Sequence, residues 1–263
     1  MATGSLLETD RDYPTSDGKP MAETDIHRKV IVDLIDILQY RYRDRRDVYV
    51  SGDLLMFYEP GKKRRHVAPD VFVVLGVENR ERPNYLIWQE GKGPDFIIEV
   101  TSKSTRTVDQ TKKHALYRDV LKVPEYFLFD PLGEYLRPSL QGYRYVENEY
   151  VPIALEAGGL TSEVLGVRLV REGSSLRLFD LETGERLLTS AERAELEAER
   201  AELETERADR EAESRREADK RANREAERAK SAEDVARNLQ AERDRLLAEL
   251  ERLKRSRPAG NSG

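Results

Sequence analysis

The sequence predicts an α/β domain with a mixed central sheet flanked by helices, followed by a long C-terminal α-helix. Three observations support this. Residues 25–188 alternate helical and strand-like apolar patterns in the order helix, three strands, helix, strand. Residues 189–256 contain no glycine or proline, and residues 191–255 carry 20 acidic and 17 basic side chains among 65. The polar ends, 1–24 and 257–263, are expected to be disordered tails.

Each element of the domain follows from apolar spacing and turn residues. Apolar residues three and four apart predict a helix, whereas runs rich in β-branched and aromatic residues predict strands. Pro60 and Gly61 separate two such runs and predict a hairpin. The expected elements are a helix from Asp25, strands within 47–60, 66–76 and 95–100, a helix over 107–121, a strand from Glu125, and edge strands within 142–153 and 166–188.

Composition excludes several classes of function. The chain has no cysteine, which rules out disulfides, thiol catalysis and Cys-based zinc sites. No apolar segment approaches the length of a membrane span, so a soluble, cytoplasmic protein without membrane contact is expected. The net charge of −6 indicates no overall basic surface. Local basic clusters at 41–46 and 62–66 suit phosphate contacts, a solvated face or a polar hairpin turn.

Two acidic residues occur within apolar strands. Asp70 begins the run DVFVVLG, and Glu99 lies near the end of DFIIEV. Strand side chains alternate, so Asp95, Glu99 and Thr101 share one face of a strand that is apolar on both faces. A carboxylate in such a strand is costly to bury unless a divalent metal or a lysine lies beside it. The simpler alternatives are that Glu99 caps the following helix and that Asp70 is a turn residue.

The helix over 107–121 supplies a lysine. Leu116, Val120 and Leu121 predict its apolar stripe, and Lys113, three residues before Leu116, shares that face. A lysine there indicates a buried negative partner, and the alternative is a side chain that extends its ammonium group to solvent. Lys112, about 100° around the helix, is the second candidate if the helical phase differs.

Two further residues lie four positions on either side of Lys113. Asp109 precedes it and Tyr117 follows it, so all three lie near one another on the helix surface. Asp109 is expected to hold the Lys113 ammonium group, and Tyr117 is assigned first to packing.

Taken in order, these residues resemble the PD-(D/E)XK nuclease superfamily. The resemblance is closest to the Uma-two family of restriction-endonuclease-like proteins and covers roughly residues 25–185. It implies a restriction-endonuclease-like domain with an αβββαβ core. The matching elements are Pro69-Asp70, Glu99-Val100 with Ser102, Ser104 and Thr105, then Asp109, Lys113 and Tyr117, then Val123-Pro124-Glu125-Tyr126-Phe127, with His27 opening the first helix.

The resemblance implies metal-assisted hydrolysis of DNA phosphodiester bonds. Asp70, Glu99 and the backbone carbonyl of Val100 would hold one Mg²⁺ or a pair, with Mn²⁺ as the alternative ion. Lys113 would orient the attacking water and stabilise the transition state. Asp95 is a further candidate as an outer ligand, although the turn GKGPD explains it adequately.

One departure from the superfamily pattern concerns the lysine. Thr101 stands where the superfamily has a lysine, and the resemblance implies that Lys113 replaces it from the following helix. Lys103 is a less favoured substitute. If neither lysine reaches the metal, the alternative is a catalytically inactive module that binds DNA or acts as a scaffold. Restriction, repair and mobile-element roles all fit.

The charged C-terminal segment predicts a helix that pairs. Leu196 and Leu203 are seven residues apart, as are Leu239, Leu246 and Leu253, which favours a homodimeric coiled coil over about 190–255. Alanines occupy most of the seam between these groups. The alternative is an unpaired helix stabilised by opposite charges four residues apart, such as Glu206 and Arg210.

Overall fold

The computed structural model describes residues 13–16, 24–102, 105, 107–156 and 158–256. The chain forms two compact units, Met1–Ala194 and Glu195–Gly263, which are described separately. The predicted tails lie outside the described residues except for 13–16 and 24. Among the helices that are described, none is long and apolar enough to cross a membrane.

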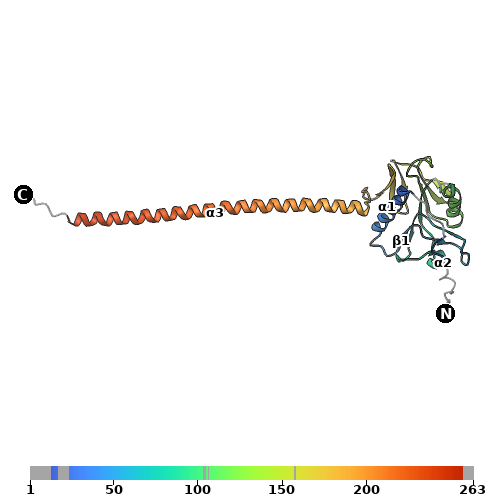
Figure 1. Ribbon diagram of the computed structural model, residues 1–263, viewed down its shortest axis with the longest axis horizontal. Helices are drawn as coiled ribbons and strands as arrows, with labels where there is room; N and C mark the ends of the chain where they lie inside the picture. The colour runs from blue at the N-terminus through green and yellow to red at the C-terminus, as the bar shows by residue number, and fades with distance from the viewer. Residues whose placement is uncertain (1–12, 17–23, 103–104, 106, 157, 257–263) are drawn as a thin grey trace, which may run out of the picture. The chain divides into compact units, whose positions relative to one another are not determined.

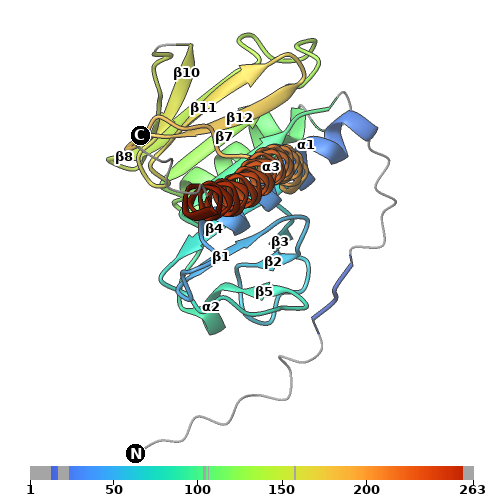
Figure 2. The same cartoon turned by 90° about the vertical axis from the view of Figure 1, so that its left-hand side faces the viewer.

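A mixed sheet forms the centre of the first unit, and the predicted fold class is confirmed (Figures 1 and 2). Within the described residues, its strand order is β1-β4-β6-β7-β8-β9. β6 and β7 are parallel, and the other neighbours are antiparallel. β6 is therefore central, as its apolar faces predict. The strands are β1 Val48–Ser51, β4 Val71–Leu75, β6 Phe96–Val100, β7 Glu125–Phe129, β8 Leu140–Val146 and β9 Glu149–Pro152.

The predicted hairpin around Pro60 and Gly61 is interrupted in both arms. Its outer parts, β1 and β4, pair in the central sheet, whereas its inner parts, β2 (Met56–Phe57) and β3 (His66–Val67), pair separately. β5 (Tyr85–Leu86) adds to β2 in parallel, and the short helix α2 (Ile87–Glu90) follows it. Neither β5 nor α2 was predicted, because elements of two and four residues are too short to produce a periodic pattern.

The runs expected as edge strands have two different positions. β8 and β9 continue the central sheet, whereas β10 (Gly159–Ser162), β11 (Val167–Glu172) and β12 (Ser175–Asp180) form a separate antiparallel sheet. Figure 2 shows this sheet and the β3-β2-β5 sheet at opposite sides of the central strands.

Apolar side chains cover both faces of the central sheet. On one face, helix α1 (Asp25–Arg41) and the β10-β11-β12 sheet pack against residues such as Val71 and Ile98. On the other face, Phe72 and Ile97 pack against Tyr85 and the helical segment that carries Tyr117. The C-terminal ends of β6 and β7 and the N-terminal end of β4 therefore lie between α1 and that helical segment.

The helical segment after β6 contains π-helical turns. η2 (Val108–Lys113) and η3 (Leu116–Val120) confirm the predicted helix, but its inward face differs from the prediction. Val120 is 51% exposed, whereas Asp109 and Tyr117 are buried. In an α-helix, a residue points about 40° around the helix axis from the residue four positions earlier. π turns hold more residues per turn, so in this segment side chains four positions apart point in more nearly the same direction. The inward stripe is consequently Asp109, Lys113 and Tyr117.

The second unit contains most of helix α3 (Ser190–Ser256), a single continuous helix (Figure 1). Its side chains from Glu195 to Leu253 are exposed, including Leu239 at 61% and Leu246 at 56%. The guanidinium group of Arg210 lies 3.6 Å from the Glu206 carboxylate, as the predicted four-residue spacing allows. Whether α3 pairs with a second copy stays a prediction.

Candidate active site

Asp70 and Glu99 lie opposite each other across β4 and β6. Val71 pairs with Ile98 in this antiparallel ladder, and Asp70 and Glu99 are the next residues along it. The amide of Val100 donates to Asp70 Oδ2 at 2.7 Å, and the amide of Asp70 donates to Glu99 Oε2 at 3.4 Å. Strand pairing alone therefore brings the two predicted carboxylates together.

Gly52 allows a close approach that holds the Asp70 segment in place. A Cβ atom added at Gly52 would lie 2.1 Å from the carbonyl oxygen of Asp70. The next amide, that of Asp53, donates to the carbonyl of Pro69 at 2.9 Å. The bend after β1 therefore rests directly on the backbone that carries Asp70, which only glycine permits.

Lys113 and Tyr117 each donate a hydrogen bond to a different carboxylate oxygen of Glu99. Lys113 Nζ lies 2.7 Å from Glu99 Oε2, and the hydroxyl of Tyr117 donates to Glu99 Oε1 at 2.6 Å. Lys113 Nζ also contacts the carbonyl of Ala68 at 3.3 Å and Asp109 Oδ1 at 3.5 Å. Lys113 thus points toward the acids, and Tyr117 combines packing with a direct contact to Glu99.

Burial makes this cluster electrostatically unusual. The loss of solvation raises the pKa of Asp70 to about 7, that of Glu99 to about 8 and that of Asp109 to about 6, although Lys113 opposes each rise. The pKa of Lys113 is raised because these carboxylates outweigh its own desolvation. Three acids share one lysine, so the fully ionised cluster carries two excess negative charges.

The other candidate residues lie in different positions. Asp95, at the opposite end of β6, accepts from the amide of Leu75 at 2.7 Å and pairs with Lys92 at 2.8 Å, which supports the turn explanation and separates it from the cluster. Thr101 is buried beyond the end of β6, and its amide donates to the carbonyl of Phe129 at 2.7 Å. Lys103 lies outside the described residues.

His27 matched an element of the family pattern, but the sequence assigned it no role in the site. It lies in the first turn of α1 and is 3% exposed. Its Nε2 atom makes a hydrogen bond with the carbonyl oxygen of Val100 and lies 3.8 Å from Asp70 Oδ2. The sequence signal was a histidine placed just after a helix cap, but 73 residues separate it from Val100, so no local pattern predicted the contact.

A cleft of about 660 Å³ adjoins the cluster. Asp70 and Lys113 line it together with Lys112 and His66, so two further basic side chains face the same space. Lys112 therefore lines the cleft, and Lys113, not Lys112, is the lysine that contacts Glu99. The remaining lining residues are Thr15, Ser16, Asp53, Leu55, Val67, Ala68, Thr105, Val108 and Leu116.

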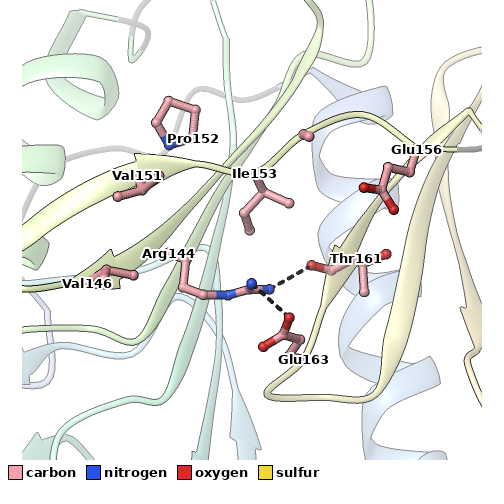
Figure 3. Close-up of a pocket in the computed structure, with 9 residues that line it drawn as sticks. Arg144, Val146, Val151, Pro152, Ile153, Glu156, Thr161 and Glu163 are labelled. Carbon is pink, nitrogen blue, oxygen red and sulfur yellow. Dashed lines mark hydrogen bonds and ion pairs between the residues drawn. The ribbon is translucent and has the colours of Figure 1, made fainter.

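A second cavity, of about 360 Å³, lies between the β8-β9 hairpin and β10 (Figure 3). Its basic residue, Arg144, points toward Thr161 and Glu163 and pairs with Glu163 at 2.8 Å and with the buried Glu125 at 3.1 Å. Its charge is thus already balanced by two acids. None of the predicted site residues lines this cavity, and the cleft beside Asp70 is the better candidate.

These observations define the class of the protein as a nuclease-like α/β domain with paired acids and a lysine at the end of its central strands. The Uma2 family, described as "Putative restriction endonuclease", has a model that matches residues 5–181. The chain belongs to this family, as its motifs predicted.

Among the solved structures that are similar to this chain is a protein from Anabaena variabilis ATCC 29413 described as "a putative nuclease belonging to DUF820", with 16% sequence identity and a TM-score of 0.42. The match covers 57% of this chain and 81% of the other. No curated protein matches the chain.

Proposed function

We propose that this protein is a metal-dependent endonuclease that hydrolyses DNA phosphodiester bonds. The observation that carries the proposal is the pairing of Asp70 and Glu99 across β4 and β6, with Lys113 Nζ 2.7 Å from Glu99. The family description supports the reaction, and the basic side chains of the cleft support a phosphate-bearing substrate.

The donor set fits a divalent cation. Within the described ranges, no three His, Asp or Glu side chains converge as a ready-made metal site. However, the two excess negative charges of the acid–lysine cluster equal the charge of one such ion. Hard carboxylate and carbonyl oxygens are the ligands that Mg²⁺ and Mn²⁺ accept. Asp70, Glu99 and the Val100 carbonyl would therefore hold the ion, and Asp109 would balance Lys113.

The bound cation would activate a water molecule and neutralise charge on the phosphate. Lys113 directs a positive charge to the same place, where it can orient the nucleophile and stabilise the pentavalent transition state. Asp109 Oδ1, at 3.5 Å, and the Ala68 carbonyl, at 3.3 Å, hold the Lys113 ammonium group. Tyr117 holds Glu99 in one orientation through its Oε1 atom.

Lys112 and His66 lie on the outer side of this cluster, where they suit contact with the substrate. Both line the cleft, and His66 follows the basic run that begins at Lys62. These groups would contact phosphates of the bound strand and hold it over Asp70. We propose DNA as the polymer because of the family description.

The C-terminal helix suits an oligomerisation arm. Leu239 and Leu246 are seven residues apart and more than half exposed. Burial of such leucines against a second copy would stabilise a parallel pair of helices. A dimer would also place two nuclease domains in one particle.

The test is plasmid cleavage in the presence of Mg²⁺ or Mn²⁺. We expect the wild type to convert supercoiled plasmid to nicked or linear forms, and Asp70→Ala, Glu99→Ala and Lys113→Ala each to abolish this. The exposed Lys29→Ala, outside the cleft and the basic clusters, is the control and should cleave normally. Cleavage that survives all three substitutions would exclude the proposed site. A wild type that binds plasmid but never cuts it would favour the inactive DNA-binding module.

A further inference from the structure

We infer that a further cavity, of about 310 Å³ and beside the cleft, binds an unstacked adenine of the DNA strand that the cleft holds. We call this cavity the Asn84 pocket, and its lining includes Tyr13, Thr15, Pro83, Asn84, Leu86 and Gln89. The inference rests on the proposed function, since it concerns the substrate of the same cleft. Asn84 and Gln89 would then set a base preference near the cut.

The Asn84 pocket adjoins the cleft at Thr15. Thr15 lines the pocket and also lines the cleft, together with Asp70 and Lys113. Successive bases of one strand are only about 3.4 Å apart along the duplex, so a phosphate held over Asp70 keeps neighbouring bases close to Thr15. A base that leaves the stack at this point can enter the pocket, as extruded bases do in enzymes that act on DNA.

Tyr13 holds this boundary in place. It is 7% exposed, and its ring centroid lies 4.7 Å from that of Phe57 and 5.4 Å from that of Trp88. Its hydroxyl accepts a hydrogen bond from the amide of Gly61 at 2.6 Å. The wall that carries Thr15 is therefore anchored in an apolar cluster, and the pocket is formed before any ligand binds.

Two amide side chains give the pocket a polar edge. Asn84 Nδ2 donates to the carbonyl oxygen of Tyr13 at 3.2 Å, which fixes the orientation of the amide while Nδ2 keeps a second hydrogen for a ligand. Gln89, on α2, contributes a second amide to the same lining. An amide presents a donor beside an acceptor, and adenine presents the complementary pair. Adenine is therefore the base that these two residues fit best.

The other part of the lining is apolar. Leu86, Pro83 and the ring of Tyr13 offer contact surface for the faces of a planar base. Small-molecule sites combine such surface with a few polar groups and have volumes from about 300 Å³ upward. The volume and lining of the Asn84 pocket thus match a site for one planar ring system.

The charged groups of the pocket balance one another. Arg82 donates to both carboxylate oxygens of Glu90, at 2.8 and 2.7 Å, and Arg80 donates to Glu90 at 2.7 Å. Arg80 Nε also lies 3.6 Å from the Glu78 carboxylate. Two acids thus offset two guanidinium groups. The pocket therefore favours a neutral base, whereas the basic side chains of the cleft favour a phosphate.

A structural role alone makes a different prediction. If Asn84 served only to fasten Tyr13, its substitution would lower stability and leave the choice of base unchanged. Gln89 separates the two roles, because its side chain is exposed and Gln89→Leu should fold as the wild type does. A change of base preference in Gln89→Leu therefore reports on recognition of the base.

The experiment uses the full-length chain and a library of DNA duplexes with a randomised segment. Cleavage with Mn²⁺ or Mg²⁺, followed by sequencing of the cut ends, gives the base preference of the wild type, Asn84→Leu and Gln89→Leu. Gln39→Leu is the matched control. Gln39 is exposed and lines neither space, and its Nε2 donates to the backbone carbonyl of Val50 at 3.3 Å, much as Asn84 bonds to Tyr13. If the protein binds DNA without cutting it, the library is sequenced after selection for binding.

We expect the wild type and Gln39→Leu to prefer adenine about ten-fold at one position near the cut, which lies within the range of one bidentate amide–base pair. Asn84→Leu and Gln89→Leu should use the four bases at that position almost equally. A mismatch at this adenine should increase cleavage by the wild type several-fold, because an unpaired base leaves the stack at lower cost. The same mismatch should change cleavage by Gln89→Leu much less.

The possible failures are distinguishable. Cleavage without an adenine preference, or with a preference that both pocket variants retain, would overturn this inference and leave the proposed function intact. A preference that the variants lose but that a mismatch does not strengthen would show that the base is read within the duplex, which also overturns it. Selection of adenine by a protein that binds without cutting would support the pocket and contradict the proposed function. Absence of both binding and cleavage would overturn both.

Discussion

Asp70 and Glu99 are cross-strand neighbours, and the amide of Asp70 donates to Glu99 Oε2 at 3.4 Å. Both side chains belong to the face of the sheet that Tyr117 and Lys113 cover. The positive charge of Lys113 thus offsets part of the cost of burying the two carboxylates. Substitutions of the acids, of Lys113 and of Tyr117 should therefore change stability and cleavage in different ways.

Lys113→Met should destabilise the protein by about 3 kcal/mol, because it leaves Glu99 and Asp109 buried without their cation. Urea unfolding monitored by circular dichroism would measure this. The adjacent Lys112→Met is the control and should change the free energy of unfolding by less than about 0.5 kcal/mol, since its side chain is exposed. Equal losses in both variants would contradict the assignment of Lys113 as the buried partner.

Asp70→Asn should abolish cleavage and yet raise the thermal stability of the protein in a chelating buffer. The substitution removes one of three buried acids that share one lysine, while the amide oxygen can still accept from Val100. We expect a gain of about 1 kcal/mol, measured by differential scanning calorimetry. An equally large loss would show that the charge of Asp70 stabilises the metal-free fold.

Tyr117→Phe should lower both stability and the rate of cleavage. The hydroxyl bonds to a buried carboxylate, so its loss should cost about 2 kcal/mol and release Glu99 from its orientation. Tyr126→Phe is the matched control, because its buried hydroxyl bonds to the backbone carbonyl of Asp109 at 3.0 Å. We expect that control to lose stability and to cleave normally. A similar drop in cleavage in both variants would leave Tyr117 with a packing role.

Asp180 should contribute stability that is lost in acid. Backbone amides of Thr183 and Glu182, with Arg41, lower its pKa to about 2. A carboxylate whose pKa is lowered by folding stabilises the fold above its unfolded pKa of about 4, and this contribution disappears as pH falls toward 2.

Urea unfolding of Asp180→Asn at pH 6 and at pH 2.5 tests this contribution. The variant should be about 1 kcal/mol less stable than the wild type at pH 6, after allowance for solvent screening, and nearly equal to it at pH 2.5. The exposed Asp44→Asn should match the wild type at both values. A deficit for Asp180→Asn that is the same at both pH values would contradict the prediction.

The coiled-coil prediction can be tested on the full chain by sedimentation velocity. The wild type should sediment as a dimer, and combined Leu239→Glu and Leu246→Glu should produce a monomer, because charged residues cannot be buried in the seam. Ala241→Glu with Ala248→Glu, about 200° around the helix, is the control and should remain dimeric. A monomeric wild type would favour the unpaired, charge-stabilised helix.

Local patterns predicted much of the fold. The apolar spacing of α1, the two-sided apolar character of β6 and the charge pattern of α3 each occur within one element. The structure agrees with all three predictions. The Asp70 and Glu99 pair was also predictable, because each acid interrupts an otherwise apolar strand and the cost of burying it calls for a compensating charge.

Other features depended on contacts between distant parts of the chain. The helix over 107–121 was placed correctly, but Val120 was assigned to its buried face and is 51% exposed. Its π turns rotate Asp109, Lys113 and Tyr117 inward, and the packing of Tyr117 against the sheet accompanies that rotation. Standard helical periodicity could not predict a phase set by a different turn.

The sequence by itself determined the class of fold, the paired acids and the candidate lysine, because strand alternation and the cost of burying charge operate within a few residues. Only the tertiary structure decided that Lys113 reaches Glu99 and that His27 meets Val100 and Asp70. Those contacts join elements far apart in the chain. Their geometry follows from how α1 and the π-helical segment pack on the two faces of one sheet, which no local pattern specifies.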